Sequence, residues 1–100
     1  MSGLWAAACV TDDCERLCER VGNRLSSCLD DWPATWADLD ATSRAGFVDD
    51  CKQSWARQRE QLEPRELDDA LLQCSEAGDA LSTMRQDGTV CDELRALYLD

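Results

Sequence analysis

The sequence predicts an all-α fold: a small disulfide-stapled bundle of about four helices. Apolar residues recur at intervals of three and four along most of the chain, as they do on one face of a helix. No stretch alternates apolar and polar residues as a β-strand does, and isoleucine is absent. Seven cysteines in 100 residues far exceed ordinary usage and favour covalent reinforcement of a small core.

The first helix is expected at residues 11–31. Thr11 is a suitable N-cap, and Pro33 should stop the helix near Asp31, because the residue before a proline avoids helical geometry. Polar and charged residues fill the face opposite to the apolar one. The predicted inward positions are Cys14, Leu17, Cys18, Val21, Leu25, Cys28, Leu29 and Trp32.

A short helical turn and a second long helix follow. Thr35 and Asp38 have the spacing of a capping box, which predicts a helical turn near residues 35–40. The second helix is expected at 43–62, with Ser43 as its N-cap. Its expected inward side chains are Phe47, Val48, Cys51, Trp55 and Leu62.

The third and fourth helices are expected at 64–85 and 89–99. Pro64 suits the first position of a helix, and the Asp-Gly pair at 87–88 predicts the turn between the two helices. Thr89 is a plausible cap for the last one. The third helix should bury Leu67, Ala70, Leu71, Cys74, Ala77, Leu81 and Met84. The fourth should bury Val90, Cys91, Leu94, Leu97 and Tyr98.

The charge balance excludes several classes of function. With 21 acidic and 10 basic residues, the net charge of −11 repels phosphate backbones, so no nucleic-acid partner is expected. The absence of histidine excludes His-containing catalytic triads and zinc sites. We assign no catalytic, cofactor-binding or metal-binding residue, and we expect a protein that is not an enzyme. Four Asp-Asp pairs, at 12–13, 30–31, 49–50 and 68–69, are interpreted as solvated helix ends.

The first nine residues are apolar and small, and Ala6, Ala7 and Ala8 directly precede Cys9. This segment resembles the end of a bacterial lipoprotein signal peptide, although a larger aliphatic residue usually stands at the position of Ala6. The resemblance implies that 1–9 is the remnant of a signal peptide and that Cys9 carries a lipid. Residues 10–100 would then form a single helical domain, similar to the small cysteine-rich lipoproteins of Gram-negative bacteria. The implied location is the cell envelope, in the periplasm or at the outer membrane, or outside the cell.

With Cys9 set aside, the remaining six of the seven cysteines are an even number, as a disulfide framework requires. The first helix contains three of them, and its own geometry disfavours a bridge within it, since Cys18 and Cys28 would lie ~15 Å apart. Each should therefore pair with a different helix, which leaves six of the fifteen conceivable pairings. Cysteines pair most readily when they lie at the same position along the axis of the bundle. Cys28 and Cys91 should lie at the same end, so this pair ranks first. The same reasoning weakly favours Cys18–Cys51 with Cys14–Cys74 over the crossed alternative.

The function that these observations favour is a non-enzymatic, acidic interaction module, exported or tethered to a surface. Its partner is an unidentified protein, and the acidic field favours a basic one. Contact with a membrane is expected only through a lipid on Cys9, and the chain would be a monomer or a Cys9-linked dimer. One alternative is a small-ligand module that binds a glycan or a lipid through Trp32, Trp36 and Trp55. Another is an intracellular acidic adaptor with reduced cysteines.

Overall fold

The computed structural model describes residues 11–99, and within them it contains helices and no strand. The helices are α2 (Asp13–Cys28), the short 3-10 helix η1 (Trp36–Leu39), α3 (Arg44–Arg59), α4 (Pro64–Asp87) and α5 (Val90–Tyr98). The predicted all-α, disulfide-stapled bundle is confirmed. The lipidation site Cys9 and the rest of segment 1–9 lie outside the described residues.

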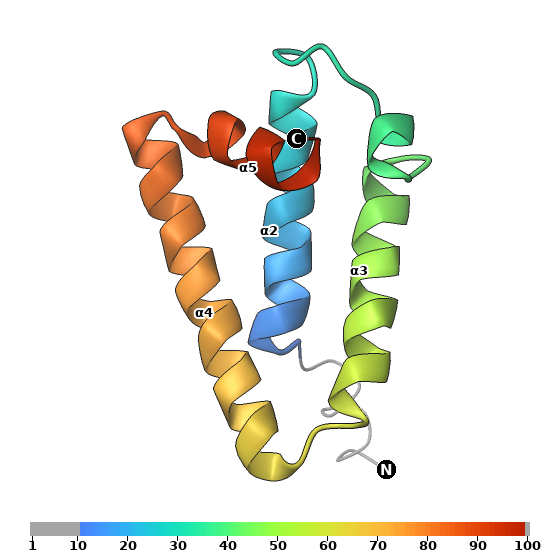
Figure 1. The fold of residues 1–100 in the computed structure, drawn as a ribbon, viewed down its shortest axis with the longest axis vertical. Helices are drawn as coiled ribbons and strands as arrows, with labels where there is room; N and C mark the ends of the chain where they lie inside the picture. Colours follow the sequence, from blue (N-terminus) through green and yellow to red (C-terminus); the bar gives the residue numbers. More distant parts are fainter. Residues whose placement is uncertain (1–10, 100) are drawn as a thin grey trace.

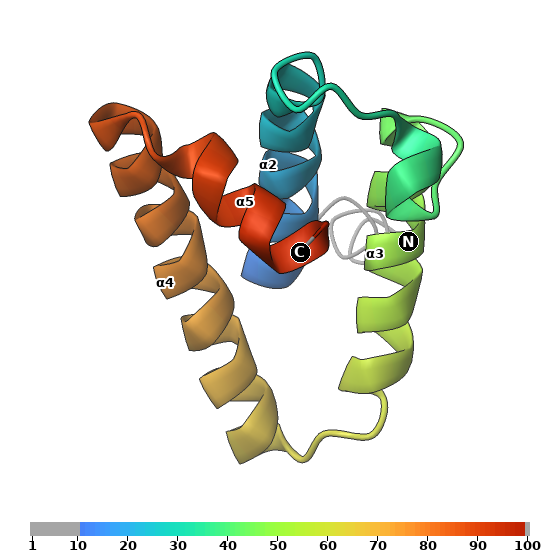
Figure 2. The same cartoon turned by 45° about the horizontal axis from the view of Figure 1, so that its top comes forward.

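Helix α2 is the central element of the fold (Figure 1). Helices α3 and α4 pack on its two sides, and α5 crosses its C-terminal half (Figures 1 and 2). Although α3 and α4 are consecutive, they diverge from one another above the loop that joins them, and each packs chiefly against α2. The prediction placed consecutive helices side by side, joined by short loops. In the structure, the bundle is open on the side between α3 and α4.

The helix ends follow local capping chemistry. At the start of α3, Ser43 Oγ accepts a hydrogen bond from the Gly46 N–H at 3.0 Å, as the N-cap prediction requires. At the start of η1, the Thr35 N–H donates to Asp38 Oδ2 at 2.9 Å, the predicted capping-box contact. Helix α4 ends at Asp87 and is followed by Gly88, whose φ of 75° is left-handed geometry that glycine adopts without a steric penalty.

The boundaries of the first helix differ from the prediction at both ends. The N-cap is Asp12, not Thr11, because the Asp12 carboxylate reaches the Glu15 N–H at 2.8 Å. The helix ends at Cys28, short of Asp31. The next residues form turns closed by bonds such as Ala34 N–H to Leu29 C=O at 2.8 Å, and Pro33 has no N–H to contribute to a continuing helix.

The other boundaries shift by a few residues. Helix α3 ends at Arg59, three residues short of the predicted 62, and α4 continues two residues past 85 to Asp87. Helix α5 covers Val90–Tyr98 within the predicted 89–99. Such differences arise because terminal turns depend on which side chains reach the free N–H and C=O groups.

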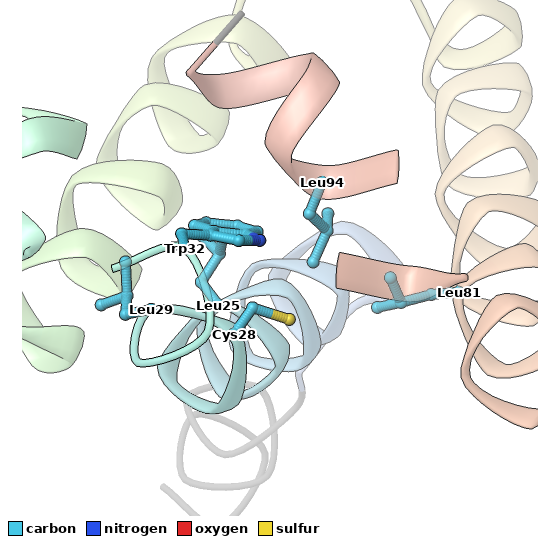
Figure 3. Close-up of a cluster of buried hydrophobic side chains, with 6 residues drawn as sticks. All are labelled: Leu25, Cys28, Leu29, Trp32, Leu81 and Leu94. Atoms are coloured by element: carbon cyan, nitrogen blue, oxygen red, sulfur yellow. The ribbon is translucent and has the colours of Figure 1, made fainter. Parts of the chain in front are cut away.

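The main apolar core lies at the C-terminal end of α2 (Figure 3). It joins side chains from α2 and the turn after it to one side chain each from α4 and α5. Its members are Leu25, Cys28, Leu29, Trp32, Leu81 and Leu94. The predicted inward face of the first helix supplies most of this core. At the other end of the molecule the buried apolar groups are Cys14, Cys18 and Trp55, so two disulfides replace much of the packing there.

Several residues expected in the core are exposed. Leu97 is 76% exposed and Tyr98 42% exposed, because α5 turns only the face around Leu94 toward the core. Ala77 is also exposed, since α4 diverges from α3 and leaves that face uncovered. The other predicted inward residues of α3 and α4, apart from Trp55 and Leu81, are half-buried.

Candidate functional site

An open apolar groove runs between α3 and α4, over the N-terminal half of α2. We call it the α3–α4 groove. Its main hollow has a volume of about 530 Å³, and an adjoining hollow of about 280 Å³ shares Leu17, Trp55, Gln58 and Cys74 with it. The main hollow is lined by Leu17, Trp55, Gln58, Leu62, Glu66, Asp69, Ala70, Gln73, Cys74 and Ala77. The adjoining hollow extends along α2 as far as Tyr98 of α5.

The disulfides explain why this groove is open. Cys14–Cys74 joins α2 to α4 with the Cα atoms 5.0 Å apart, and Cys18–Cys51 joins α2 to α3 with the Cα atoms 5.8 Å apart. Cys28–Cys91 joins α2 to α5. Every bridge therefore has one end on α2, and none ties α3 to α4. The structure contains Cys28–Cys91, which the expected positions along the bundle rank first, and the pairing of Cys18–Cys51 with Cys14–Cys74 that they weakly favour.

The lining of the groove combines apolar surface with negative charge. No lysine or arginine lines either hollow. Glu66 and Asp69, both exposed on the α4 wall, are its acidic residues, and Gln58 and Gln73 add neutral hydrogen-bonding groups. Such a surface fits an apolar group that carries positive charge at its edge.

Trp55 is the predicted tryptophan that the structure places in the groove. It is only 8% exposed, and its indole N–H donates to Asp12 Oδ2 at 2.9 Å. Its N–H is therefore already satisfied inside the protein. What Trp55 offers to a binding partner is the apolar part of its ring.

The structure does not bring the three predicted tryptophans together. Trp32 belongs to the main core beyond the C-terminal end of α2, and Trp36 packs against the same core and against Phe47, with ring centroids 5.8 Å apart. Trp55 contacts Asp12, at the opposite end of α2. A helix of that length separates its ends by roughly 20–25 Å. A single ligand site formed by all three is therefore wrong for this fold.

Asp12 is a key residue that the sequence interpretation missed. Its Oδ1 caps α2, while its Oδ2 accepts from Trp55 Nε1 at 2.9 Å and from Arg59 Nη1 at 3.0 Å. Its side chain is only 14% exposed, so it is not the solvated helix end that the Asp-Asp pattern predicted. The contact fixes the C-terminal half of α3 beside the start of α2, where it forms one wall of the groove. The sequence did contain a signal for the capping role of Asp12, because Glu15 follows it at the three-residue spacing of an N-cap contact.

Tyr98 closes one end of the groove and provides a spectroscopic probe, because it is the only tyrosine of the chain. Its ring packs edge-on against Phe47, with centroids 5.8 Å apart. This partial burial disfavours the charged phenolate and raises the pKa of Tyr98 above its ordinary value.

We therefore expect Tyr98 to ionise at higher pH in the folded protein than in the unfolded chain. Because the folded state holds this proton more tightly, the free energy of unfolding should fall as pH rises through about 10, where an unfolded tyrosine titrates. A tyrosinate absorbance titration of the native and the urea-unfolded protein measures the difference. Coincident titration curves would contradict the partial burial of this ring.

Within residues 11–99, no group of three His, Cys, Asp or Glu side chains is placed to hold a metal ion. None of the helices in this range has the length and apolarity that a membrane span requires. No family model matches the chain, and neither a curated protein nor a solved structure matches it.

Proposed function

We propose that this protein is an exported, non-enzymatic interaction module that binds a basic, amphipathic segment of a partner protein in the α3–α4 groove. The observation that carries the proposal is the groove itself: an apolar trough with acids on one wall, between two helices that are each bridged to a third. The partner chemistry follows from the lining. Apolar side chains would enter the trough, and lysine or arginine would face Glu66 and Asp69.

Export is supported by the three disulfides. Bridges such as Cys14–Cys74, Cys18–Cys51 and Cys28–Cys91 form and persist in oxidising compartments, which favours a location outside the cytoplasm over an intracellular adaptor with reduced thiols. The bridges use six of the seven cysteines, and Cys9 is the seventh. This parity supports the lipid anchor and the bacterial envelope location that the lipobox resemblance implies.

The intact mass of the protein from its own host tests the anchor and the export together. We expect a chain that begins at Cys9, carries a diacylglycerol, and shows six thiols to an alkylating reagent only after reduction. A doubled mass that reduction halves would replace the lipid with a Cys9-linked dimer. Seven thiols that alkylate without reductant, on a chain beginning at Met1, would contradict export.

The dimensions and charge of the groove favour a helical segment as its occupant. Its main hollow of about 530 Å³ lies within the size range of ordinary binding pockets, enough for a few apolar side chains presented at helical spacing. The net charge of −11 attracts a basic partner at long range and speeds its approach at low salt. The disulfides hold the walls in place before binding, so less conformational entropy is lost on association.

Two synthetic helical peptides with the same leucine face test the binding chemistry, one with lysine and the other with glutamate on the polar face. We expect the lysine peptide to bind more tightly, with an affinity that falls as salt rises. The variant Asp69→Arg, in the groove wall, should weaken binding of the lysine peptide by about tenfold, from lost attraction and added repulsion. Fluorescence anisotropy of labelled peptides measures these affinities.

Asp68→Arg is the matched control. It makes the same change in net charge at the neighbouring exposed position, but Asp68 does not line the groove. Its effect on binding should be less than about twofold at physiological salt. Equal affinity for the two peptides, or equal effects of the two variants, would show that the groove is not the binding surface.

A further inference from the structure

A second hollow, of about 260 Å³, lies between α2 and α4 and shares no lining residue with the α3–α4 groove. We call it the arginine cleft. Helix α2 contributes Arg20, Asn23 and Arg24, and helix α4 contributes Leu81, Ser82 and Arg85. The two helices bring three arginines from distant parts of the sequence to the lining of one hollow.

The charge of the arginine cleft is opposite in sign to the net charge of the chain. Acidic residues outnumber basic ones by 21 to 10, yet three of those ten line this hollow and no carboxylate does. Arg20 and Arg24 stand one helical turn apart, a spacing at which like charges repel and destabilise a helix. The cleft therefore concentrates positive charge at an energetic cost to the isolated protein.

The adjoining hollow between the same two helices shows how the chain balances arginine elsewhere. There Asp13 and Asp79 line the wall together with Arg16 and Arg20, and Arg16 forms an ion pair with Asp13 at 3.5 Å. Arg20 therefore borders both hollows, whereas Arg24 and Arg85 line the arginine cleft and not the adjoining hollow. Neither Asp13 nor Asp79 lines the arginine cleft, so Arg24 and Arg85 have no carboxylate beside them in that lining.

The three cleft arginines have no anionic partner within residues 11–99. The ion pairs in this part of the chain are Arg16–Asp13, Lys52–Glu19 and Arg59–Asp12, and no hydrogen bond in it involves Arg20, Arg24 or Arg85 side chains. Their guanidinium groups are therefore available to an external anion.

Two contacts fix the positions of residues that line the cleft, although Gly78, which one of them involves, lines the adjoining hollow. Asn23 Oδ1 accepts from Arg44 Nη1 at 2.7 Å, which leaves the amide N–H groups of Asn23 as donors. Arg20 lies against Gly78 of α4, with Nη1 2.7 Å from the position that a Cβ atom on that glycine would occupy. Only glycine at this site lets the guanidinium approach the α4 backbone so closely.

We propose that the arginine cleft binds a phosphate group. Arg24 and Arg85, with Arg20 at the border, and the Asn23 amide and Ser82 hydroxyl give the lining several hydrogen-bond donors, and guanidinium matches the oxygens of phosphate with paired hydrogen bonds. The volume of about 260 Å³ exceeds what a bare phosphate needs, so the phosphate can carry an attached group. Free phosphate and the headgroup of a phospholipid share this chemistry. The proposal is independent of the occupant of the α3–α4 groove.

The test uses the full-length, disulfide-bonded chain without a lipid on Cys9. Calorimetric titration with inorganic phosphate, at constant ionic strength, should give saturable binding. Co-sedimentation with vesicles of phosphatidylglycerol, compared with phosphatidylcholine, tests the lipid source. Arg24→Gln and Arg85→Gln should each weaken binding by about tenfold, the usual effect of losing a charge-assisted hydrogen bond.

Arg65→Gln is the matched control, because it removes one positive charge at the start of α4, far along the helix from Arg85. It should leave binding unchanged. Saturation by phosphate alone, or by anionic vesicles alone, supports the site and identifies its source. Absence of saturable binding to both probes, or an equal loss in Arg65→Gln, would overturn the proposal.

Discussion

Reduction of the three disulfides should unfold this protein. Each bridge contributes roughly 2–4 kcal/mol, and three together reach the net stability of ~5–15 kcal/mol that is typical of a domain. The apolar core offers little to replace them, because among residues 11–99 only Leu25 and Cys28 are buried to below 2% exposure. We expect the near-ultraviolet circular dichroism of the tryptophans to collapse after reduction and alkylation. A cooperative thermal transition that survives in the alkylated protein would contradict this.

The double variant Cys28→Ala/Cys91→Ala gives a graded form of the same experiment. It opens a loop with a sequence separation of 63 residues at the core end of the molecule. Because the other two bridges still constrain the unfolded chain, we expect a loss of about 3–4 kcal/mol in the free energy of unfolding. Urea denaturation of the oxidised protein measures it, and a loss below about 1 kcal/mol would show that the core holds α5 without the bridge.

Replacing Asp12 with alanine should produce the next largest loss, about 2–4 kcal/mol. The substitution removes the N-cap of α2, worth ~1 kcal/mol, and leaves the buried Trp55 N–H without its acceptor, at a cost of ~1–3 kcal/mol. It also breaks the contact with Arg59, so α3 should lose its attachment at the N-terminal end of α2. Thermal and urea unfolding give the magnitude, and hydrogen exchange along α3 locates the effect.

Asp13→Ala is the control for Asp12, since it removes the same side chain one position further along. Asp13 forms only an exposed ion pair with Arg16 at 3.5 Å, which should be worth less than about 0.5 kcal/mol. If the two variants lose the same stability, the three-way contact of Asp12 contributes nothing beyond its charge.

The two candidate surfaces depend on α2 in different ways. The α3–α4 groove exists because α2 holds both walls by disulfides and by Asp12, while the walls make little contact with each other. The arginine cleft lies elsewhere on the α2–α4 interface. It exists because the packing of these two helices brings Arg20 and Arg24 of α2 to the same hollow as Arg85 of α4. The protein thus presents an acidic apolar trough and a basic cleft, with different partner chemistry at each.

The sequence by itself determined the helices, because helix formation depends on local signals. Capping and helix-start signals act within one turn of the chain, so their effects could be predicted without knowing the fold. Examples are Ser43, the pair Thr35 and Asp38, and Pro64. The strong apolar face of the first helix likewise predicted Leu25, Cys28 and Trp32 in the core. Helical rise limited the disulfide pairings to a few.

Only the tertiary structure decided the functional surfaces. The angle between α3 and α4 is set by how each packs on α2, and no local pattern encodes whether two helices with a common neighbour also contact one another. For this reason Ala77 was predicted to be buried and is exposed, and Trp55 is separated from Trp32 and Trp36. Leu97 was also predicted to be buried, and it is exposed because α5 turns only the face around Leu94 toward the core. Asp12 and the arginine cleft were missed for the same reason, since their partners lie tens of residues away along the chain.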